Sequence, residues 1–505
     1  MNKNWFLIIF GLSGMAALIY EITWIRPLSL VFGTTIYAVS TIVAAFILGL
    51  ALGSWIAGRY TDKLKNPLKY FAFLQIGIGF YGIFLLPVFS ILPEVYVNFY
   101  QHTYPNQHLF VFIQVLMAIS MISVPATMIG TTLPLMMKNY SQSFTSIGKD
   151  VGKLDASNSV GAVIGTLAAG FFMIPILGIQ TSIVITAIVN IGLGIAILLA
   201  GKYLSKTYIA AIGIIAVAFL IGVPSYDIAT INQGVYAHND PIYFTEISKE
   251  IFKLQTVQYY EESLYSTVVV FSFPGDVTRL TINGKTQCSN SPHVIEGLNN
   301  FASIPYELFE YNYGKPQNAL NVGLGCGATS KWLSEHVNTT TVEIDPAVPE
   351  TTGFFFDHID HDLIIDDARN WMLRNDVSFD IITTEPFDPW VNNGGMYTLE
   401  YFVLLNKTLS ENGLVSQWVP NFEMTEEDYY ILYNTFHTVF PYVYVYQMEL
   451  GSDLQWIFIG SQKPLQVKEN ELYLYNHEKI ETRETILSTD DRPVLEFSTA
   501  QNIYD

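Results

Sequence analysis

Cysteine is almost absent from this sequence: Cys288 and Cys326 are the two cysteines in 505 residues. Two cysteines are too few for the disulfide framework that stabilises small secreted domains. A Cys-x-x-Cys motif does not occur, and the nine histidines do not show the spacing of metal ligands. We therefore expect no metal site in this protein.

Charged residues are also scarce, and they are unevenly divided along the chain. They make up 14% of the sequence, and the mean hydropathy of +0.31 is too high for a wholly soluble enzyme. Residues 1–223 contain 11 Lys and Arg against 5 Asp and Glu, whereas the remainder contains 14 against 40. The acidic second half would repel phosphates, which excludes nucleic acid as a partner. An acidic cleft there would suit a cationic substrate such as a polyamine, although an acid excess also arises from a solvated surface.

Long apolar runs fill the first half and predict a multi-pass α-helical membrane domain over residues 1–223. The seven expected spans are Trp5–Leu28, Ile36–Ala57, Tyr70–Leu92, Leu109–Met137, Val160–Leu177, Ile183–Ala200 and Tyr208–Val223. Glycines recur in the second and fifth spans, and this recurrence predicts close packing between helices in lipid. These glycines are Gly49, Gly53, Gly58, Gly161, Gly165 and Gly170.

Basic residues follow the even-numbered spans and give an orientation. They are Arg59, Lys63, Lys65, Lys69, Lys138, Lys149, Lys153, Lys202 and Lys206. Because basic loops stay in the cytoplasm, seven spans place everything after Val223 outside it. A nucleoside cofactor is a cytosolic metabolite and favours the opposite side. The sequence therefore predicts a cell-membrane protein and leaves open the side on which its second half lies.

The second half contains four apolar segments, each of which ends in glycine or in acids. The endings are Gly323-Leu324-Gly325-Cys326-Gly327, Glu343-Ile344-Asp345, Asp366-Asp367 and Glu385. Carboxyl ends of parallel strands meet at one edge of an open α/β sheet, where ligands bind. We therefore expect these residues to share one site.

The residue types at this edge favour a nucleoside ligand. Gly323, Gly325 and Gly327 would let the backbone approach a ligand closely, because no Cβ intervenes. Glu343, at the tip of the second strand, is suited to accept both hydroxyls of a ribose. Asp366 or Asp367 lies where a carboxylate could accept a hydrogen of the adenine amino group.

The rest of the second half completes an α/β arrangement. Residues 224–291 are predicted to form a linker and a small β-hairpin region with a turn at Asn283-Gly284. Residues 292–505 alternate strands and helices and end in two strands, Val443–Gln447 and Leu454–Ile459. This order is typical of an α/β methyltransferase-type Rossmann domain. Asn392–Gly395 form a flexible segment suited to a lid.

At this point the motifs resemble those of the spermidine synthase (polyamine aminopropyltransferase) family, in its membrane-fused branch. The motifs are Leu18–Trp24, Gly49–Gly53, Gly130–Pro134, Ile282–Gln287, Val342–Asp345, Asp367–Arg369 and Glu385–Trp390. The resemblance implies transfer of an aminopropyl group from decarboxylated S-adenosylmethionine to a diamine such as putrescine, as in spermidine biosynthesis. It needs no metal, and it is compatible with a homo-oligomer.

The resemblance also implies residue roles. Glu385 would take the proton of the attacking amine. Gln287 would contact the aminopropyl arm of the co-substrate, and Asp345 would join the glycines and the other acids in binding it. Asp388 and Tyr397 would bind the amine substrate.

Some positions depart from the family pattern. Cys326 stands where the soluble enzymes usually carry an aspartate, Asn283 replaces another aspartate, and Asn290-Ser291 replaces an acidic pair. These departures leave two alternatives open. One is a transferase that uses intact S-adenosylmethionine to alkylate another amine or a lipid-proximal acceptor. The other is a non-catalytic membrane protein that senses a ligand or couples it to transport.

Overall fold

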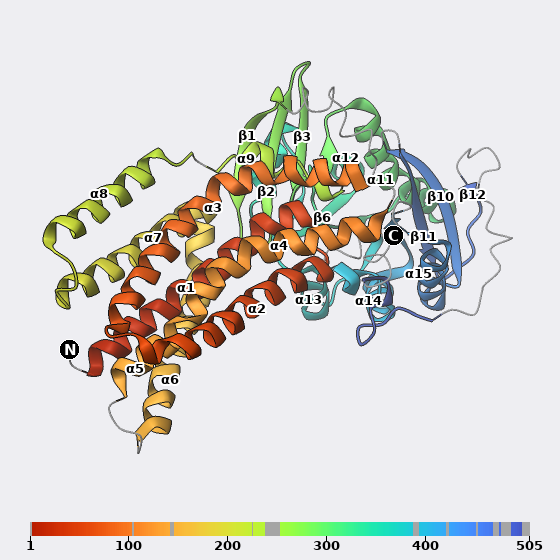
Figure 1. Cartoon of the computed structure of the whole chain (residues 1–505). Helices are drawn as coiled ribbons and strands as arrows, with labels where there is room; N and C mark the ends of the chain where they lie inside the picture. The colour runs from red at the N-terminus through yellow and green to blue at the C-terminus, as the bar shows by residue number, and fades with distance from the viewer. Residues whose placement is uncertain are drawn as a thin grey trace. The chain divides into compact units, whose positions relative to one another are not determined.

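The structure is a computed structural model of the chain, shown in Figure 1. It describes residues 3–103, 106–141, 146–224, 226–237, 253–386, 393–420, 424–450, 453–467, 474–475 and 486–496. The chain divides into two compact units. The first covers Met1–Gly33 and Tyr37–Pro241, and the second covers Thr34–Ile36 and Ile242–Asp505.

All the regular secondary structure among the described residues of the first unit is helical. Its helices are α1 (Lys3–Phe32), α2 (Ile36–Tyr60), η1 (Thr61–Lys63), α3 (Pro67–Thr103), α4 (Gln107–Gly130), α5 (Thr132–Tyr140), α6 (Ile147–Ala168), a π-helical stretch (Ala169–Met173), α7 (Ile174–Ala200), α8 (Lys206–Gly222), α9 (Ile228–Ile231) and η4 (Val235–Ala237).

Five helical stretches of this unit are long and apolar enough to cross a membrane, among the residues that the structure describes. They are Lys3–Phe32, Ile36–Lys63, Pro67–Thr103, His108–Tyr140 and Ile147–Ala200. The last has 54 residues, or about 81 Å of straight helix, far more than a bilayer core of about 30 Å. Gly178 interrupts it with non-helical angles (φ 79°, ψ 165°). The apolar helix α8 is shorter, at 17 residues, and the number of seven spans stays a prediction.

Glycines set the closest helix contacts of the first unit. A Cβ on Gly161 would lie 1.9 Å from the Gly11 carbonyl oxygen, and one on Gly53 would lie 2.0 Å from the Thr127 carbonyl oxygen. The α1–α6 and α2–α4 pairs can therefore approach so closely only where a side chain is missing. Gly58 and Gly170, in contrast, have open space at the Cβ position, so the predicted packing role is wrong for these two.

The second unit begins with an antiparallel sheet. Its strands are β1 (Thr256–Glu262), β2 (Thr267–Phe273), β3 (Val277–Ile282) and β4 (Lys285–Ser289), in the order β1-β2-β3-β4. Asn283 and Gly284 join β3 to β4 with positive φ angles of 51° and 79°. This is the backbone of a type I′ turn, which confirms the predicted hairpin.

A larger sheet with flanking helices follows. Its strands are β5 (Asn318–Val322), β6 (Asn338–Glu343), β7 (Asp362–Ile365), β8 (Phe379–Thr384), β9 (Leu409–Val419), β10 (Tyr442–Leu450), β11 (Asp453–Ser461) and β12 (Leu474–Tyr475). Its helices are α11 (Pro292–Tyr313), α12 (Ala328–His336), η6 (Pro349–Phe354), α13 (Ala368–Arg374), η8 (Gly394–Met396), α14 (Leu399–Thr408) and α15 (Glu426–Val439).

The strand order of this sheet is β12-β10-β11-β9-β8-β5-β6-β7. The neighbours from β9 to β7 pair in parallel, whereas β11 is antiparallel to both β9 and β10. A parallel sheet with a final antiparallel hairpin is the α/β methyltransferase-type arrangement expected from the sequence. Its parallel strands require helical crossovers, which α12, α13 and α14 supply.

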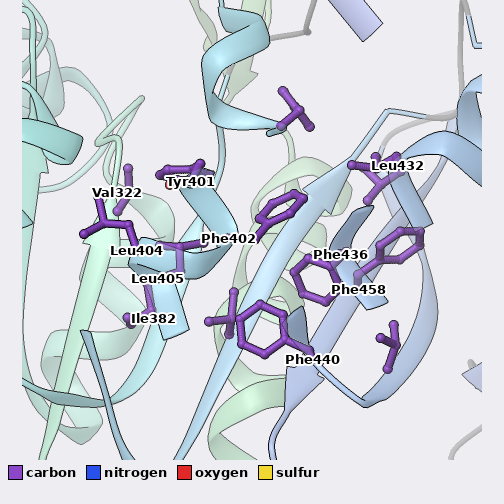
Figure 2. Packing of buried hydrophobic residues seen from close by; sticks show 14 of the residues in the cluster. Val322, Ile382, Tyr401, Phe402, Leu404, Leu405, Leu432, Phe436, Phe440 and Phe458 are labelled. Atoms are coloured by element: carbon purple, nitrogen blue, oxygen red, sulfur yellow. The ribbon is translucent and has the colours of Figure 1, made fainter. Parts of the chain in front are cut away.

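Apolar side chains cover the sheet on both faces. One core cluster includes Val322 and Ile382 from the strands and Phe402, Phe436 and Phe458 around them (Figure 2). A second cluster joins the apolar face of α11 to other side chains of the same strands. The two cores hold the strands in place and leave their carboxyl ends as the edge on which polar residues gather.

Candidate active site

Main-chain hydrogen bonds bring the predicted strand endings together. The Gly323 N–H donates to the Val342 carbonyl at 2.9 Å, and the Asp366 N–H donates to the Glu343 carbonyl at 2.9 Å. The Glu385 N–H donates to the Val322 carbonyl at 3.3 Å. The endings of β5, β6, β7 and β8 therefore lie side by side, in the order in which the strands pair.

The glycine turn after β5 provides an open backbone surface. Gly325 has φ 53°, and a Cβ placed on it would meet no atom within 4 Å. Gly327 has φ 91°, and a Cβ there would lie 2.4 Å from the Ile359 side chain. Gly325 therefore faces space that a ligand can fill, whereas Gly327 is needed for packing at the start of α12. Binding of a ligand by these glycines stays a prediction.

Glu343 holds the glycine turn in place through hydrogen bonds to the main chain. One carboxylate oxygen accepts the Leu324 N–H at 2.8 Å, and the other accepts the Asp345 N–H at 2.9 Å. The side chain is buried, and desolvation raises its pKa above the usual value. Since both oxygens already accept backbone hydrogens, Glu343 fixes the turn, and its predicted contact with a ribose would use the remaining lone pairs.

Asp345 connects the two sheets of the second unit. Its carboxylate accepts the hydroxyls of Ser263 at 2.6 Å and Ser266 at 2.5 Å, and also the Ala347 N–H at 3.0 Å. Ser263 and Ser266 lie between β1 and β2, so these bonds tie that connection to the end of β6. The predicted part of Asp345 in co-substrate binding stays a prediction.

The acids after β7 are engaged with the chain as well. Asp366 forms an ion pair with Arg374 and accepts the Asp367 N–H at 2.9 Å. Asp367 caps the N-terminus of α13 by accepting the Asn370 N–H at 2.8 Å. The cap fixes the direction of the Asp367 side chain at the edge. Its predicted bond to an adenine is not tested by these contacts.

Glu385 lies at the end of β8 and reaches the start of α12. Its carboxylate accepts a hydrogen bond from the Thr329 hydroxyl. Loss of water around the side chain raises the pKa of Glu385 to about 7, and the Thr329 hydrogen bond acts in the opposite direction. A carboxyl group with this pKa can take a proton from a substrate near neutral pH.

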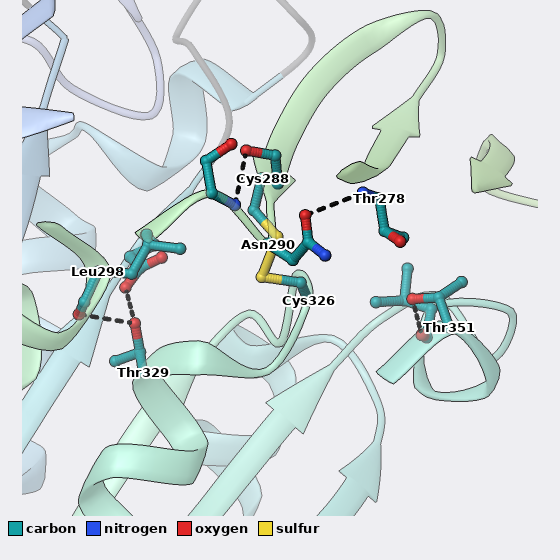
Figure 3. The surroundings of a disulfide bond; sticks show 11 residues. Thr278, Cys288, Asn290, Leu298, Cys326, Thr329 and Thr351 are labelled. Atoms are coloured by element: carbon teal, nitrogen blue, oxygen red, sulfur yellow. Dashed lines mark hydrogen bonds between the residues drawn. A yellow bond between two sulfur atoms is a disulfide. The ribbon is translucent and has the colours of Figure 1, made fainter. Parts of the chain in front are cut away.

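A disulfide joins β4 to the glycine turn. Cys288 and Cys326 are bonded to each other, with their Cα atoms 6.3 Å apart. Both are buried, and Figure 3 shows the bond between β4 and the turn that leads to Thr329. We predicted no disulfide framework, and this single bond was not foreseen because the cysteines are 38 residues apart. Gln287 precedes Cys288, so the bond also holds Gln287 near the turn.

Of the two residues predicted to bind the amine, the structure describes Tyr397 but not Asp388. Tyr397 is fully buried, and its hydroxyl donates to the Pro386 carbonyl at 3.4 Å. Tyr397 therefore contacts Pro386, the residue that follows Glu385. Asp388 falls outside the described residues. In the part of the chain that the structure describes, no group of three or more His, Cys, Asp or Glu residues is placed to hold a metal ion.

Sequence reasoning missed three features of this edge besides the disulfide. They are the Thr329 hydroxyl on Glu385, the pairing of Asp345 with Ser263 and Ser266, and an ion pair between Arg369 and Asp490. A hydroxyl in the first turn of a helix after a glycine turn is a local signal that could have singled out Thr329. The other two join segments 79 to 121 residues apart, and no local pattern marks them.

The sheet order, the glycine turn and the acidic strand ends define an α/β domain of the methyltransferase type. Residues 305–470 match the spermine/spermidine synthase domain, so this part of the chain is similar to that family of transferases.

Known relatives cover most of the chain. It is 22% identical to the polyamine aminopropyltransferase of Leptospira interrogans over 508 aligned residues, which span 96% of this chain and 94% of the relative. It is 20% identical to polyamine aminopropyltransferase 1 of Streptomyces coelicolor, over 90% of this chain and 83% of the relative. The crystal structure of spermidine synthase from Thermotoga maritima matches 41% of this chain and 72% of its own, with 18% identity and a TM-score of 0.35.

Proposed function

We propose that this protein is a membrane-bound aminopropyltransferase that joins an aminopropyl group of decarboxylated S-adenosylmethionine to a diamine such as putrescine. The observation that carries the proposal is the placement of Glu385. Its carboxyl group, with a pKa of about 7, lies just after β8, the strand next to β5, whose glycine turn is open at Gly325. The proposed proton acceptor and the proposed surface for the donor would thus share one edge.

The residues at the edge suit a positively charged donor and a cationic acceptor. Glu385, Asp366 and Asp367 contribute carboxyl groups, and the chain after Val223 carries 40 acids against 14 bases. The donor supplies a sulfonium, which leaves as a neutral thioether. The open face of Gly325 and the turn held by Glu343 would receive its nucleoside part.

The reaction then needs orientation and one proton transfer. The amine nitrogen forms a bond to the carbon beside the sulfonium, and the carbon–sulfur bond breaks with its electron pair staying on sulfur. The proton released from nitrogen passes to the Glu385 carboxylate, which must be ionised to accept it. Burial near Thr329 fixes the direction of the carboxylate, and orientation of this kind accounts for much of the rate.

One observation favours a second candidate, the use of intact S-adenosylmethionine. The family resemblance expects an aspartate at position 326, but here that position is a cysteine held in a disulfide. Without a carboxylate there, the turn would repel the carboxylate of the intact donor less strongly. A transferase acting on another amine is the alternative that follows.

Incubation of the purified protein with putrescine and each form of the donor distinguishes these functions. We expect methylthioadenosine and a triamine from the decarboxylated donor. S-adenosylhomocysteine from the intact donor would support the second candidate, and donor binding without turnover would contradict both. Glu385→Gln should lose turnover and keep donor binding. Glu335→Gln, which removes an exposed acid paired with Lys331 on α12, is the matched control and should keep full activity.

A further inference from the structure

We propose that Arg369 and Asp490 are positioning residues that hold the 393–398 loop against Glu385 through a C-terminal strap. The strap is residues 486–496, and the loop leads into α14. This inference rests on the proposed function for its kinetic part. The match to the spermine/spermidine synthase domain ends at residue 470, so the strap lies outside the matched segment.

The central contact is a two-pronged ion pair. Arg369 donates to one Asp490 oxygen at 3.0 Å and to the other at 2.6 Å, and a third bond runs from Arg369 to the Gly395 carbonyl at 2.7 Å. A guanidinium and a carboxylate that meet in this way fix both distance and angle. Arg369 therefore sets the place of the strap and of the loop at the same time.

Further bonds join the strap to the loop and to α14. Asp490 accepts the Thr398 hydroxyl at 2.7 Å, and its N–H donates to the Glu400 carboxylate at 2.8 Å. The Leu399 N–H donates to the Ser488 carbonyl at 2.8 Å. Leu495 is fully buried in the same core cluster as Phe402, so the strap is also held by apolar packing.

Two glycines let the strap lie close to the loop. A Cβ on Gly394 would lie 2.6 Å from a Glu496 carboxylate oxygen, and one on Gly395 would lie 3.2 Å from the Arg369 guanidinium. A side chain at Gly394 would push the strap away, and one at Gly395 would crowd the Arg369 guanidinium that holds the strap. Of the segment Asn392–Gly395 that suggested a flexible lid, Asn392 falls outside the described residues, and Gly394 and Gly395 lie in close contact with Glu496 and Arg369. Its role as a lid stays a prediction.

The loop and the helix α14 that follows it each contact one neighbour of Glu385. Tyr397 donates to the Pro386 carbonyl at 3.4 Å, and the Tyr401 hydroxyl lies 2.8 Å from the Thr384 hydroxyl. Arg369 also lies over the Tyr401 ring, 5.9 Å from its centroid. A shift of the loop would therefore disturb the Pro386 main chain directly and the Thr384 side chain through α14, next to the proposed proton acceptor.

The proposal predicts a loss of catalysis without a loss of donor binding. For Asp490→Asn, we expect kcat with putrescine to fall on the order of tenfold, because coupled contacts of this kind contribute enough to change a rate by that factor. We expect the affinity for methylthioadenosine, measured by calorimetry, to change less than about twofold. Arg369→Lys keeps the positive charge but loses the two-pronged hydrogen bonding of the guanidinium. Its kcat should therefore lie between those of the wild type and Arg369→Ala.

Hydrogen exchange tests the strap without reference to the reaction. In Asp490→Asn, the amides of Tyr397 and Leu399 should exchange faster, while those of β5 and β8 remain as in the wild type. The matched control is Glu411→Gln, which breaks the exposed Lys463–Glu411 pair of the same unit and should change neither exchange nor kinetics.

The outcomes separate this proposal from the proposed function. Unchanged exchange at Tyr397 and Leu399 overturns the strap, even if the enzyme is active. If Asp490→Asn lowers kcat, methylthioadenosine affinity and thermal stability together, the proposal is overturned as well. The ion pair would then be a general structural support. If the wild type transfers no aminopropyl group, faster exchange in the variant still supports the strap while the proposed function fails.

Discussion

Glu385 combines two influences that act on its proton in opposite directions. Desolvation favours the protonated form, whereas the Thr329 hydroxyl, which donates to the carboxylate, favours the ionised form. The balance places the pKa near 7. Glu385 is thus ionised in a large fraction of molecules at neutral pH, as its proposed role as proton acceptor requires.

The pH dependence of the reaction follows from this balance. The base works only when ionised, so kcat/KM should rise with pH through about 7 and level off above it. Thr329→Val removes the hydrogen bond that lowers the pKa, so the rise should move to higher pH. Thr329→Ser keeps the hydroxyl and should retain the wild-type profile. A profile that is the same in Thr329→Val would contradict the assignment of this rise to Glu385.

At the scale of single elements, the glycine turn between β5 and α12 shows two different uses of glycine. Gly325 is open, and Gly327 is packed against Ile359. Both have positive φ angles, which cost a residue with a Cβ about 1–2 kcal/mol. The backbone cost of a substitution is therefore similar at Gly325 and Gly327. The two positions differ in the space available to an added Cβ.

Alanine substitutions should separate these uses. Gly327→Ala should lower the free energy of unfolding by more than the backbone cost alone, because its Cβ would lie 2.4 Å from Ile359. Gly325→Ala should lower the free energy of unfolding by about the backbone cost alone. It should also weaken methylthioadenosine binding. Denaturant unfolding and calorimetry measure the two effects. Equal destabilisation with unchanged affinity in Gly325→Ala would place the nucleoside elsewhere.

The elements of the second unit could be predicted from the sequence because their signals are local. Apolar runs that end in glycine or acid marked β5, β6, β7 and β8, and Asn283-Gly284 marked the hairpin. The contacts that hold the edge in shape could not be predicted in this way. Asp345 with Ser263, Cys288 with Cys326, and Arg369 with Asp490 are pairs that form only after the chain has folded.

At the scale of the whole molecule, the distribution of charge and the disulfide both bear on which side of the membrane the second unit occupies. Basic residues gather in loops between the apolar helices, whereas the second unit is acidic and contains a buried disulfide. Basic loops are cytoplasmic, and disulfides persist in oxidising compartments. With the odd number of spans predicted from the sequence, both observations support the proposal that the second unit lies outside the cytoplasm, and a donor would then have to reach that side.

Engineered cysteines can test this orientation, because the two native cysteines are bonded to each other. Glu411 is 87% exposed in the second unit, and Lys65 is exposed between α2 and α3. A membrane-impermeant maleimide should label Glu411→Cys in intact cells and Lys65→Cys only after lysis. The reverse pattern would place the catalytic unit in the cytoplasm, and labelling of both in intact cells would contradict the basic-loop argument.

The bond between Cys288 and Cys326 has a practical consequence for the handling of this protein. It closes a stretch of 38 residues, and in the chain-entropy account such a crosslink contributes about 4 kcal/mol to stability. Dithiothreitol in a purification buffer would remove that contribution and free the turn that bears Gly325. An inactive preparation obtained under such conditions would describe the reduced polypeptide rather than the enzyme.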